Sequence, residues 1–250
     1  MRQPGPTRRA FTIEHLDRVD STNRYVLDAA RAGAPEGLVA VADHQTAGRG
    51  RLGRAWMAPP GASLLVSVLL RPEVAPDRLH VCTAAAALAM SDAVGLTAGF
   101  VPDLKWPNDL LAGGRKLAGL LAEVDMGPRA TVRAVVVGIG VNVTGHELPA
   151  EIAETATACN LVAGREVSRD ELLIAFLERL DTWLDTDDRS LLDHYRDRLI
   201  TIGMRVRIQR ADGSVVGVAR GLDDFGGLVV DTDGEEITVA AGDVVHLRPS

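Results

Sequence analysis

Residues 63–70 read Ser-Leu-Leu-Val-Ser-Val-Leu-Leu, one of the two longest apolar runs in the chain. The run is rich in β-branched and aliphatic residues and Pro72 follows it, so it predicts a buried strand. Upstream, residues 38–42 predict another short buried strand. Downstream, Pro76-Asp77 opens an alanine-rich helix that we expect to run to about Val94 and to end at Gly95. Around this segment the chain therefore alternates strands and helices.

Further elements lie on both sides of this centre. Residues 11–19 predict a strand, and Ser21-Thr22 offers an N-cap to an amphipathic helix that stops at Gly33. Three more strands are expected around residues 104–106, 117–124 and 132–143, with a turn at Gly113-Gly114 between the first two. The capping box Ser168-x-x-Glu171 precedes another helix, and a last helix is expected at about residues 190–199.

The pattern changes after Gly203. Short apolar runs alternate with the turn signals Asp212-Gly213, Gly226-Gly227 and Asp233-Gly234, which is typical of a small all-β barrel. We therefore divide the chain at Ile202-Gly203, into residues 1–202 and 203–250. The second part carries five arginines against eight acids, so it is not an electrostatic nucleic-acid module.

Composition excludes several classes of protein. The 250 residues are 46% hydrophobic and 24% charged with a net charge of −7, which argues against a general nucleic-acid or anionic-membrane binder. Two cysteines, Cys82 and Cys159, make neither a disulfide scaffold nor a zinc motif. No apolar h-region follows the arginines of residues 1–10, and the apolar runs are too short to span a bilayer. We expect a cytoplasmic protein without a membrane partner.

The stretch Gly48-Arg-Gly-Arg-Leu-Gly-Arg-Ala-Trp56 is the most chemically suggestive segment. Its glycines allow close backbone approach, and its arginines supply forked donors for carboxylate or phosphate. Such dense like charge predicts a mobile loop unless anions neutralise it. A solvated basic loop is the alternative, and the segment is not a GxxxxGK[ST] P-loop.

Three later stretches carry the remaining signals. The chain has 25 arginines but only two lysines, Lys105 in Lys-Trp-Pro-Asn-Asp109 and Lys116 in residues 115–123. Strict alternation over residues 115–123 places Lys116 and Gly119 on opposite strand faces. Gly119, and the two glycines within residues 137–143, predict a close neighbour on their strands. Each stretch also has a purely structural alternative. Residues 105–109 could be an ordinary turn, Lys116 could be a surface lysine on an edge strand, and residues 137–143 could be a bulged core strand.

Taken together, these segments supply groups for two kinds of anion. Seven residues could hold a phosphate chain and a carboxylate at once: Arg49, Arg51, Arg54, Lys105, Lys116, Asn108 and Asn142. That chemistry is the activation of a carboxylate by a nucleotide.

The sequence resembles the biotin–protein ligases. GRGRLGRAW, KWPNDLL, RKLAGLLAE and VVVGIGVNV occur in the order and spacing of that family, and Ser21-Thr22-Asn23 and Gln45-x-Ala47 match as well. The resemblance spans about residues 13–247. It implies an α+β fold with a mixed central sheet, an SH3-like C-terminal domain, and two-step chemistry with biotin and Mg-ATP.

The resemblance also implies roles for individual residues. The biotin-binding residues would be Ser21, Thr22, Asn23, Gln45, Gly48, Arg49, Gly50, Arg51, Lys116, Gly119 and Gly138. The nucleotide-binding residues would be Arg51, Arg54, Trp56, Asn108, Lys116 and Asn142, with Trp56 on adenine. Lys116, Arg51 and Arg49 would be catalytic, and Asp109 would help to place Mg²⁺.

The implied product is biotinyl-5′-AMP, from which biotin passes to a lysine of a biotin carboxyl carrier domain of acyl-CoA carboxylases. Only 20 residues precede Ser21, so we expect the monofunctional class without DNA binding, as a monomer or weak homodimer. Two alternatives stay open: a lipoate–protein ligase of the same broad fold, and a non-enzymatic biotin binder. The GRGR and KWPND segments argue against the former, and the nucleotide-facing residues argue against the latter.

Overall fold

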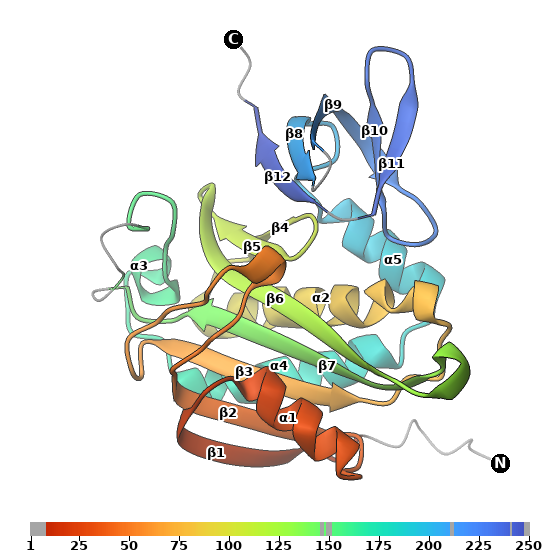
Figure 1. Ribbon diagram of the computed structural model, residues 1–250. Coiled ribbons are helices and arrows are strands. Elements are labelled where there is room, and N and C mark those ends of the chain that lie inside the picture. Colours follow the sequence, from red (N-terminus) through yellow and green to blue (C-terminus); the bar gives the residue numbers. More distant parts are fainter. Residues whose placement is uncertain (1–8, 146–147, 149–151, 211–212, 241, 248–250) are drawn as a thin grey trace, which may run out of the picture.

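The computed structural model describes residues 9–145, 148, 152–210, 213–240 and 242–247, which form two sheets and the helices around them (Figure 1). The first sheet has seven strands in the order β1-β2-β3-β7-β6-β5-β4, and only β1 and β2 pair in parallel. Its strands are β1 (Thr12–Val19), β2 (Leu38–Gln45), β3 (Ser63–Leu70), β4 (Asp103–Lys105), β5 (Asp109–Ala112), β6 (Arg115–Met126) and β7 (Val132–Asn142). The predicted mixed sheet is confirmed.

Helices cover both faces of this sheet. They are α1 (Thr22–Arg31), α2 (His80–Ala98), α3 (Cys159–Ala163), α4 (Arg169–Leu184) and α5 (Asp188–Asp197), with 3₁₀ turns at η1 (Arg51–Gly53), η2 (Pro76–Arg78) and η3 (Pro128–Ala130). α1 packs on one face through a small core that includes Val26 and Leu69, whereas α2 and α4 lie on the other face (Figure 1). Every residue of β3 is buried as a result.

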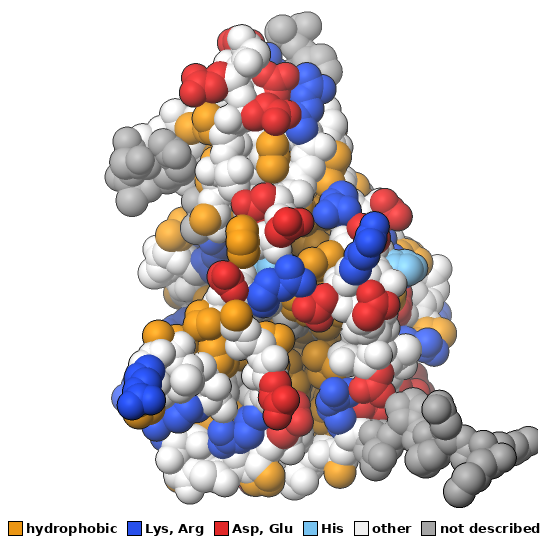
Figure 2. All heavy atoms as spheres, turned by 90° about the vertical axis from the view of Figure 1, so that its right-hand side faces the viewer, with side chains coloured by type: hydrophobic (Ala, Val, Ile, Leu, Met, Phe, Trp, Pro, Cys, Tyr) orange, Lys and Arg blue, Asp and Glu red, His pale blue; other side chains and the backbone are white. Residues whose placement is uncertain are grey.

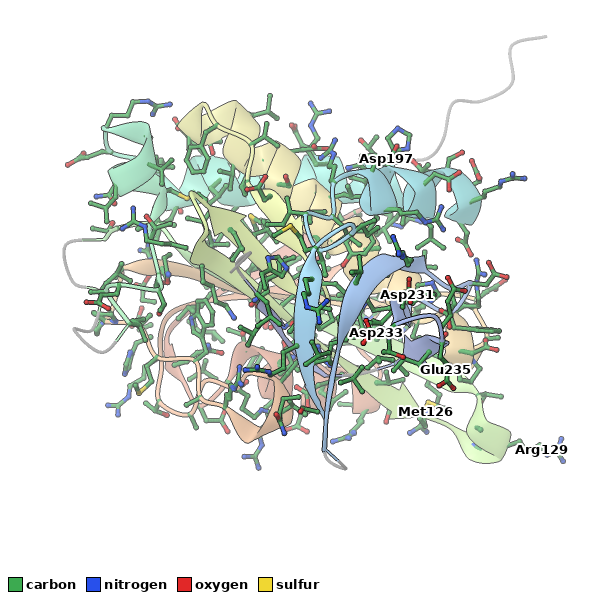
Figure 3. All side chains as sticks on the ribbon, turned by 90° about the horizontal axis from the view of Figure 1, so that it is seen from above. Met126, Arg129, Asp197, Asp231, Asp233 and Glu235 are labelled. Carbon is green, nitrogen blue, oxygen red and sulfur yellow. The ribbon has the colours of Figure 1, made fainter. Side chains whose placement is uncertain are left out.

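The C-terminal segment forms a separate antiparallel sheet. Its strands are β8 (Arg205–Arg210), β9 (Gly213–Leu222), β10 (Leu228–Asp231), β11 (Glu236–Val239) and β12 (Asp243–His246), in the order β11-β10-β9-β8-β12. Acidic side chains gather at the β10–β11 hairpin, where Asp231, Asp233 and Glu235 lie together, whereas Arg129 extends away at the tip of the β6–β7 hairpin (Figure 3). The indole Nε1 of Trp106 donates to the carbonyl of Gly226 at 2.9 Å and so links the two sheets.

Several local predictions are confirmed. The strand at residues 63–70 has the predicted bounds, and Ser168 Oγ accepts from the Glu171 amide at 3.2 Å as an N-cap. Helix α1 ends before Gly33, whose φ is 97°. The predicted turn at Asp212-Gly213 lies partly outside the described residues, because Asp212 is not among them.

Other local predictions are wrong. Helix α2 passes through Gly95 and ends at Gly99, which adopts the left-handed conformation with φ 81°. A Cβ on Gly95 would lie 3.3 Å from Val101 Cγ2, so this glycine leaves room for the returning chain instead of ending the helix. The sequence reading also missed the short strand β5 and helix α3, each too brief to show a periodicity of its own.

One helical stretch within the described residues, Pro76–Ala98, is long and apolar enough to cross a membrane. Its most apolar window is 72% buried within the protein, as expected for the core helix of a packed domain.

Candidate active site

One pocket collects most of the predicted site residues. It lies where the start of α1 and the end of β2 meet residues 48–56, which we call the arginine loop, above strands β5, β6 and β7. The lining consists of Ser21, Thr22, Asn23, Gln45, Arg49, Gly50, Arg51, Leu52, Arg54, Ala55, Trp56, Asn108, Asp109, Lys116, Gly119, Leu120, Leu121, Gly138, Ile139, Gly140 and Gly242. Because Gly242 belongs to the C-terminal segment, both parts of the chain border the pocket.

Three predicted residues lie outside this lining. Asn142 is buried, and its Nδ2 donates to the Thr157 carbonyl at 3.0 Å. Gly48 serves the arginine loop itself, because a Cβ there would overlap the carbonyl oxygen of Trp56. Lys105 on β4 also does not line the pocket. Their roles toward a ligand therefore remain predictions.

The N-terminus of α1 supplies the neutral polar wall. Ser21 occupies the N-cap position and is 3% exposed, but its side chain makes no capping hydrogen bond. The Thr22 amide and hydroxyl both donate to Gln45 Oε1, at 2.8 and 3.1 Å. Buried Ser67 lies beneath them, with its Oγ 2.8 Å from Thr22 Oγ1 and 2.7 Å from Asn23 Oδ1. This wall is thus held in place by its own hydrogen bonds.

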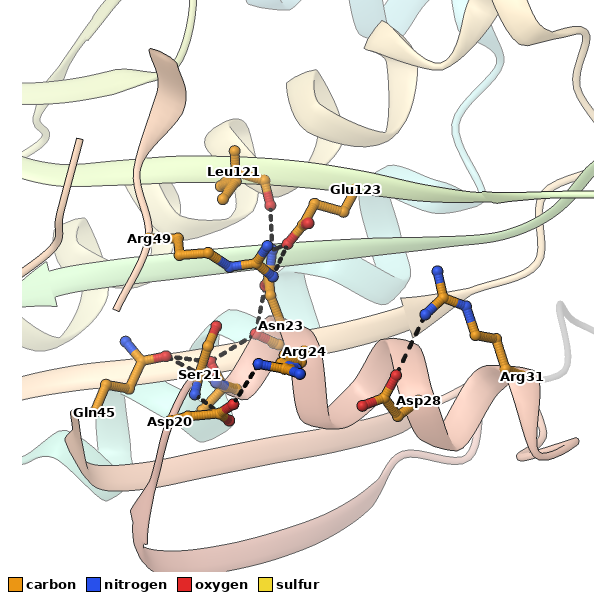
Figure 4. A network of polar contacts seen from close by, with 12 residues as sticks. Asp20, Ser21, Asn23, Arg24, Asp28, Arg31, Gln45, Arg49, Leu121 and Glu123 are labelled. Carbon is orange, nitrogen blue, oxygen red and sulfur yellow. Dashed lines mark hydrogen bonds and ion pairs between the residues drawn. The ribbon is translucent and has the colours of Figure 1, made fainter. Parts of the chain in front are cut away.

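The arginine loop folds into a short hairpin. The Trp56 amide donates to the Gly48 carbonyl at 2.9 Å, and the Gly50 amide donates to the Arg54 carbonyl at 2.7 Å. The guanidinium of Arg49 pairs with Glu123 of β6 at 2.7 Å (Figure 4), while Arg51 donates to Asn108 Oδ1 at 3.4 Å. Arg49 and Arg51 are thereby directed to different partners, which reduces their mutual repulsion.

Trp56 anchors the loop to the sheet. Gly119 of β6 and Gly140 of β7 are direct cross-strand partners, and an added Cβ on either would meet the Trp56 indole. The close neighbour that these glycines predicted is therefore this side chain, and at Gly119 also Lys116. The indole Nε1 is buried and has no hydrogen-bond partner among the described residues. The predicted adenine contact stays a prediction, since part of the indole surface is already covered.

Lys116 occupies the centre of the charged region. Its Nζ lies 2.6 Å from Asp109 Oδ1 and 5.8 Å from the centroid of the Trp56 ring. The alternation predicted for β6 is wrong here, because a register shift opposite Leu110 and Leu111 adds one residue to β6. This bulge turns Lys116 toward the same pocket as Gly119.

Asp109 is a lone carboxylate in this pocket. Within the described ranges no group of three or more His, Cys, Asp or Glu side chains could hold a metal ion. Mg²⁺ is commonly held by one or two carboxylates together with substrate phosphates, and Asp109 fits that pattern of binding with a nucleotide present.

A second cavity adjoins the first at Arg51 and Asn108 and extends toward Phe225 and Gly226 of the C-terminal segment. Its wall includes Tyr195, whose hydroxyl donates to the Pro107 carbonyl at 3.4 Å and whose pKa is raised by burial. Burial also lowers the pKa of His80 on the same wall, which favours the neutral imidazole.

Sequence reasoning missed some residues that shape the site. Ser67 and Leu121 gave no signal, because a serine or leucine inside a strand is ordinary. Gly140 was predicted to have a close neighbour but was not among the candidate binding residues, and Glu123 lay within a stretch already singled out but received no role. An acidic side chain in a segment expected to bind anions was the overlooked signal at Glu123.

Comparisons with known proteins agree on one family. The biotin/lipoate A/B protein ligase family matches residues 15–142, and the biotin protein ligase C-terminal domain matches residues 201–247. A biotin–[acetyl-CoA-carboxylase] ligase of Mycobacterium tuberculosis is 41% identical over 94% of this chain and 89% of its own. A ligase of the same description from Paracoccus denitrificans is 34% identical, over 86% of this chain and 92% of its own.

Solved structures agree with the sequence comparisons. The biotin protein ligase from Aquifex aeolicus in complex with biotin and ATP superposes with a TM-score of 0.80 at 28% identity, over 95% of this chain and 99% of its own. This chain belongs to the biotin/lipoate A/B protein ligase family and carries the C-terminal domain of the biotin protein ligases.

Proposed function

We propose that the chain activates biotin with ATP to form biotinyl-5′-AMP and then transfers biotin to a lysine of a biotin carboxyl carrier domain of acyl-CoA carboxylases. One observation carries this proposal. A single pocket joins a neutral hydrogen-bonding wall on α1 to the cations Arg49, Arg51 and Lys116. Biotin has the matching chemistry, with a neutral ureido ring at one end and a carboxylate at the other.

The neutral wall would bind the ureido ring. Ser21, Thr22 and Gln45 would exchange hydrogen bonds with it, and the absence of a capping hydrogen bond from the Ser21 side chain supports this role. Gly119 and Gly138 would line the same part of the pocket, and a Cβ added at Gly138 would overlap the side chain of Asn23. Prearranged polar groups of this kind reduce the ordering required on binding.

The charged region would carry out the first step. The biotin carboxylate is already ionised at pH 7 and needs no general base to attack the α-phosphorus of ATP. As the new oxygen–phosphorus bond forms, the bond to the β-phosphate oxygen breaks and pyrophosphate leaves. Arg49, Arg51 and Lys116 would hold the carboxylate against the phosphate and stabilise the negative charge on the crowded oxygens.

The nucleotide would lie beside this centre. Arg54, Trp56 and Asn108 line the same pocket, and Asn142 is assigned to the nucleotide by the family pattern alone. Asp109 would hold Mg²⁺ together with the phosphates, and Mg²⁺ would supply further positive charge there.

In the second step, an acceptor lysine amine attacks the acyl carbon of the anhydride, and the bond to the phosphate oxygen breaks to release AMP. Until then the intermediate must be kept from water, and an ordered arginine loop would cover it.

We further propose residues 1–202 as the catalytic domain, residues 203–250 as the C-terminal domain, a cytoplasmic location, a monomer or weak homodimer, and no nucleic-acid partner. The last is supported by the net charge of −7 and by the interspersed acidic and basic side chains on the face shown in Figure 2.

Exchange of pyrophosphate into ATP tests the function directly. The purified protein is supplied with Mg²⁺ and either biotin or lipoate. Exchange that depends on biotin supports the proposal. Exchange with lipoate would reassign the substrate, and exchange with neither would point to a binding protein.

A further inference from the structure

Glu123 on β6 connects two walls of the pocket. Its Oε2 accepts a hydrogen bond from Arg49 Nη2 at 2.7 Å and another from Asn23 Nδ2 at 2.9 Å (Figure 4). Arg49 comes from the arginine loop, and Asn23 comes from the first turn of α1. One carboxylate oxygen of Glu123 therefore fixes the guanidinium of Arg49 relative to the side-chain amide of Asn23.

The carboxylate of Glu123 contacts Arg49 but does not border the pocket. Glu123 is absent from the pocket lining and borders an adjoining hollow, which Arg49 and Leu121 also border. Arg49 thus borders both spaces, whereas Glu123 borders the adjoining hollow. An acid placed there orients the guanidinium without occupying the space of an anionic ligand.

The ion pair between Glu123 and Arg49 limits the movement of the Arg49 side chain. Three arginines within six residues repel one another, and Arg49 has a half-exposed side chain with many rotamers. A charged hydrogen bond restricts those rotamers, whereas an ion pair this exposed adds little to the stability of the fold. Its effect should therefore appear in ligand binding more than in unfolding.

We propose that Glu123 is a positioning residue that holds Arg49 in place for the biotin carboxylate. This rests on the proposed function of the pocket. Asn23 keeps two other partners, the Leu121 carbonyl at 3.0 Å and Ser67 Oγ, so the helix wall stays in place when Glu123 is changed. The influence of Glu123 on the ligand therefore passes through Arg49.

The test compares Glu123→Gln with Asp125→Asn. Asp125 lies on the same strand and pairs with Arg133 at 2.8 Å, but it borders neither the pocket nor the adjoining hollow. Glu123→Gln should raise the biotin KM in pyrophosphate exchange by about tenfold and leave kcat within about threefold. Asp125→Asn should change neither constant.

Two further measurements test whether Glu123 acts on biotin binding through Arg49. Without ligand, trypsin should cut after the arginines of residues 48–56 faster in Glu123→Gln than in the wild type, with the melting temperature nearly unchanged. In a double-mutant cycle, Arg49→Ala and Arg49→Ala/Glu123→Gln should have the same biotin KM, because Glu123 has nothing left to position.

An unchanged biotin KM in Glu123→Gln, or fully additive effects in the cycle, would overturn the proposal. If the wild type shows no exchange with biotin, the proposed function fails instead. The trypsin comparison needs no biotin, so it still tests the role of Glu123 in that case. Equal cleavage of the arginine loop in the wild type and in Glu123→Gln would overturn the positioning role.

Discussion

The ammonium of Lys116 on β6 lies 2.6 Å from the carboxylate of Asp109 on β5, so the two charged groups lie together in the pocket. The bulge in β6 creates this contact by turning Lys116 inward. The same ammonium lies over the Trp56 ring, which limits its freedom from a second direction.

Removal of the Lys116 charge should abolish most of the activation of biotin by ATP. Lys116→Ala should slow biotin-dependent pyrophosphate exchange by about a hundredfold or more, the usual cost of losing one electrostatic donor to a transition state. The half-exposed side chain contributes little to packing, so the melting temperature should change little. Near-normal exchange would contradict the catalytic role of Lys116.

A methyl group at Gly140 should release Trp56 from the sheet. Gly140→Ala places a Cβ against the indole, and overpacking of this kind costs about 1–3 kcal/mol. We expect lower stability and a biotin KM raised by about tenfold, because the arginine loop loses its anchor. Thermal unfolding and exchange kinetics measure the two effects.

The control for this substitution is Gly221→Ala on β9. A Cβ added to Gly221 would have no neighbouring atom within 4 Å, so neither stability nor KM should change appreciably. Equal behaviour of the two alanine variants would show that Trp56 does not depend on the glycine pair.

The link between the two sheets should be measurable at Trp106. Trp106→Phe keeps most of the buried ring but deletes the hydrogen bond from Nε1 to the Gly226 carbonyl. The free energy of unfolding should fall by about 1 kcal/mol, measured by urea denaturation. An unchanged midpoint would mean that this hydrogen bond adds nothing to the contact between the sheets.

The two free cysteines should be inert in the native state. Burial raises the pKa of both Cys82 and Cys159 from 9.0 to about 12, so both thiols stay protonated at pH 8. A disulfide reagent should therefore react with them only on unfolding. Rapid labelling of either native thiol at pH 8 would contradict this expectation.

The same shift has a consequence for stability. Between pH 9.0 and about 12 the unfolded thiols ionise while the folded ones keep their protons, so the unfolded state binds fewer protons. Stability should decline with rising pH in that window. Replacing both cysteines with alanine should remove this part of the decline in the melting temperature.

Features that depend on neighbouring residues could be predicted from the sequence alone. The strand of residues 63–70 and the cap of α4 by Ser168 follow from local composition and local hydrogen bonds. Most residues of the pocket could also be named in advance, because they lie in short continuous motifs that resemble those of the biotin–protein ligases.

The way in which distant elements meet required the three-dimensional arrangement. Three contacts of the site join segments far apart in the chain. They are the pairing of Gly119 with Gly140, the packing of Trp56 against these two glycines, and the ion pair of Glu123 with Arg49. The inward turn of Lys116 depends on a bulge, and one extra residue in a strand reverses which side chains share a face. Local periodicity contains no information on strand register, and register sets the geometry of this site.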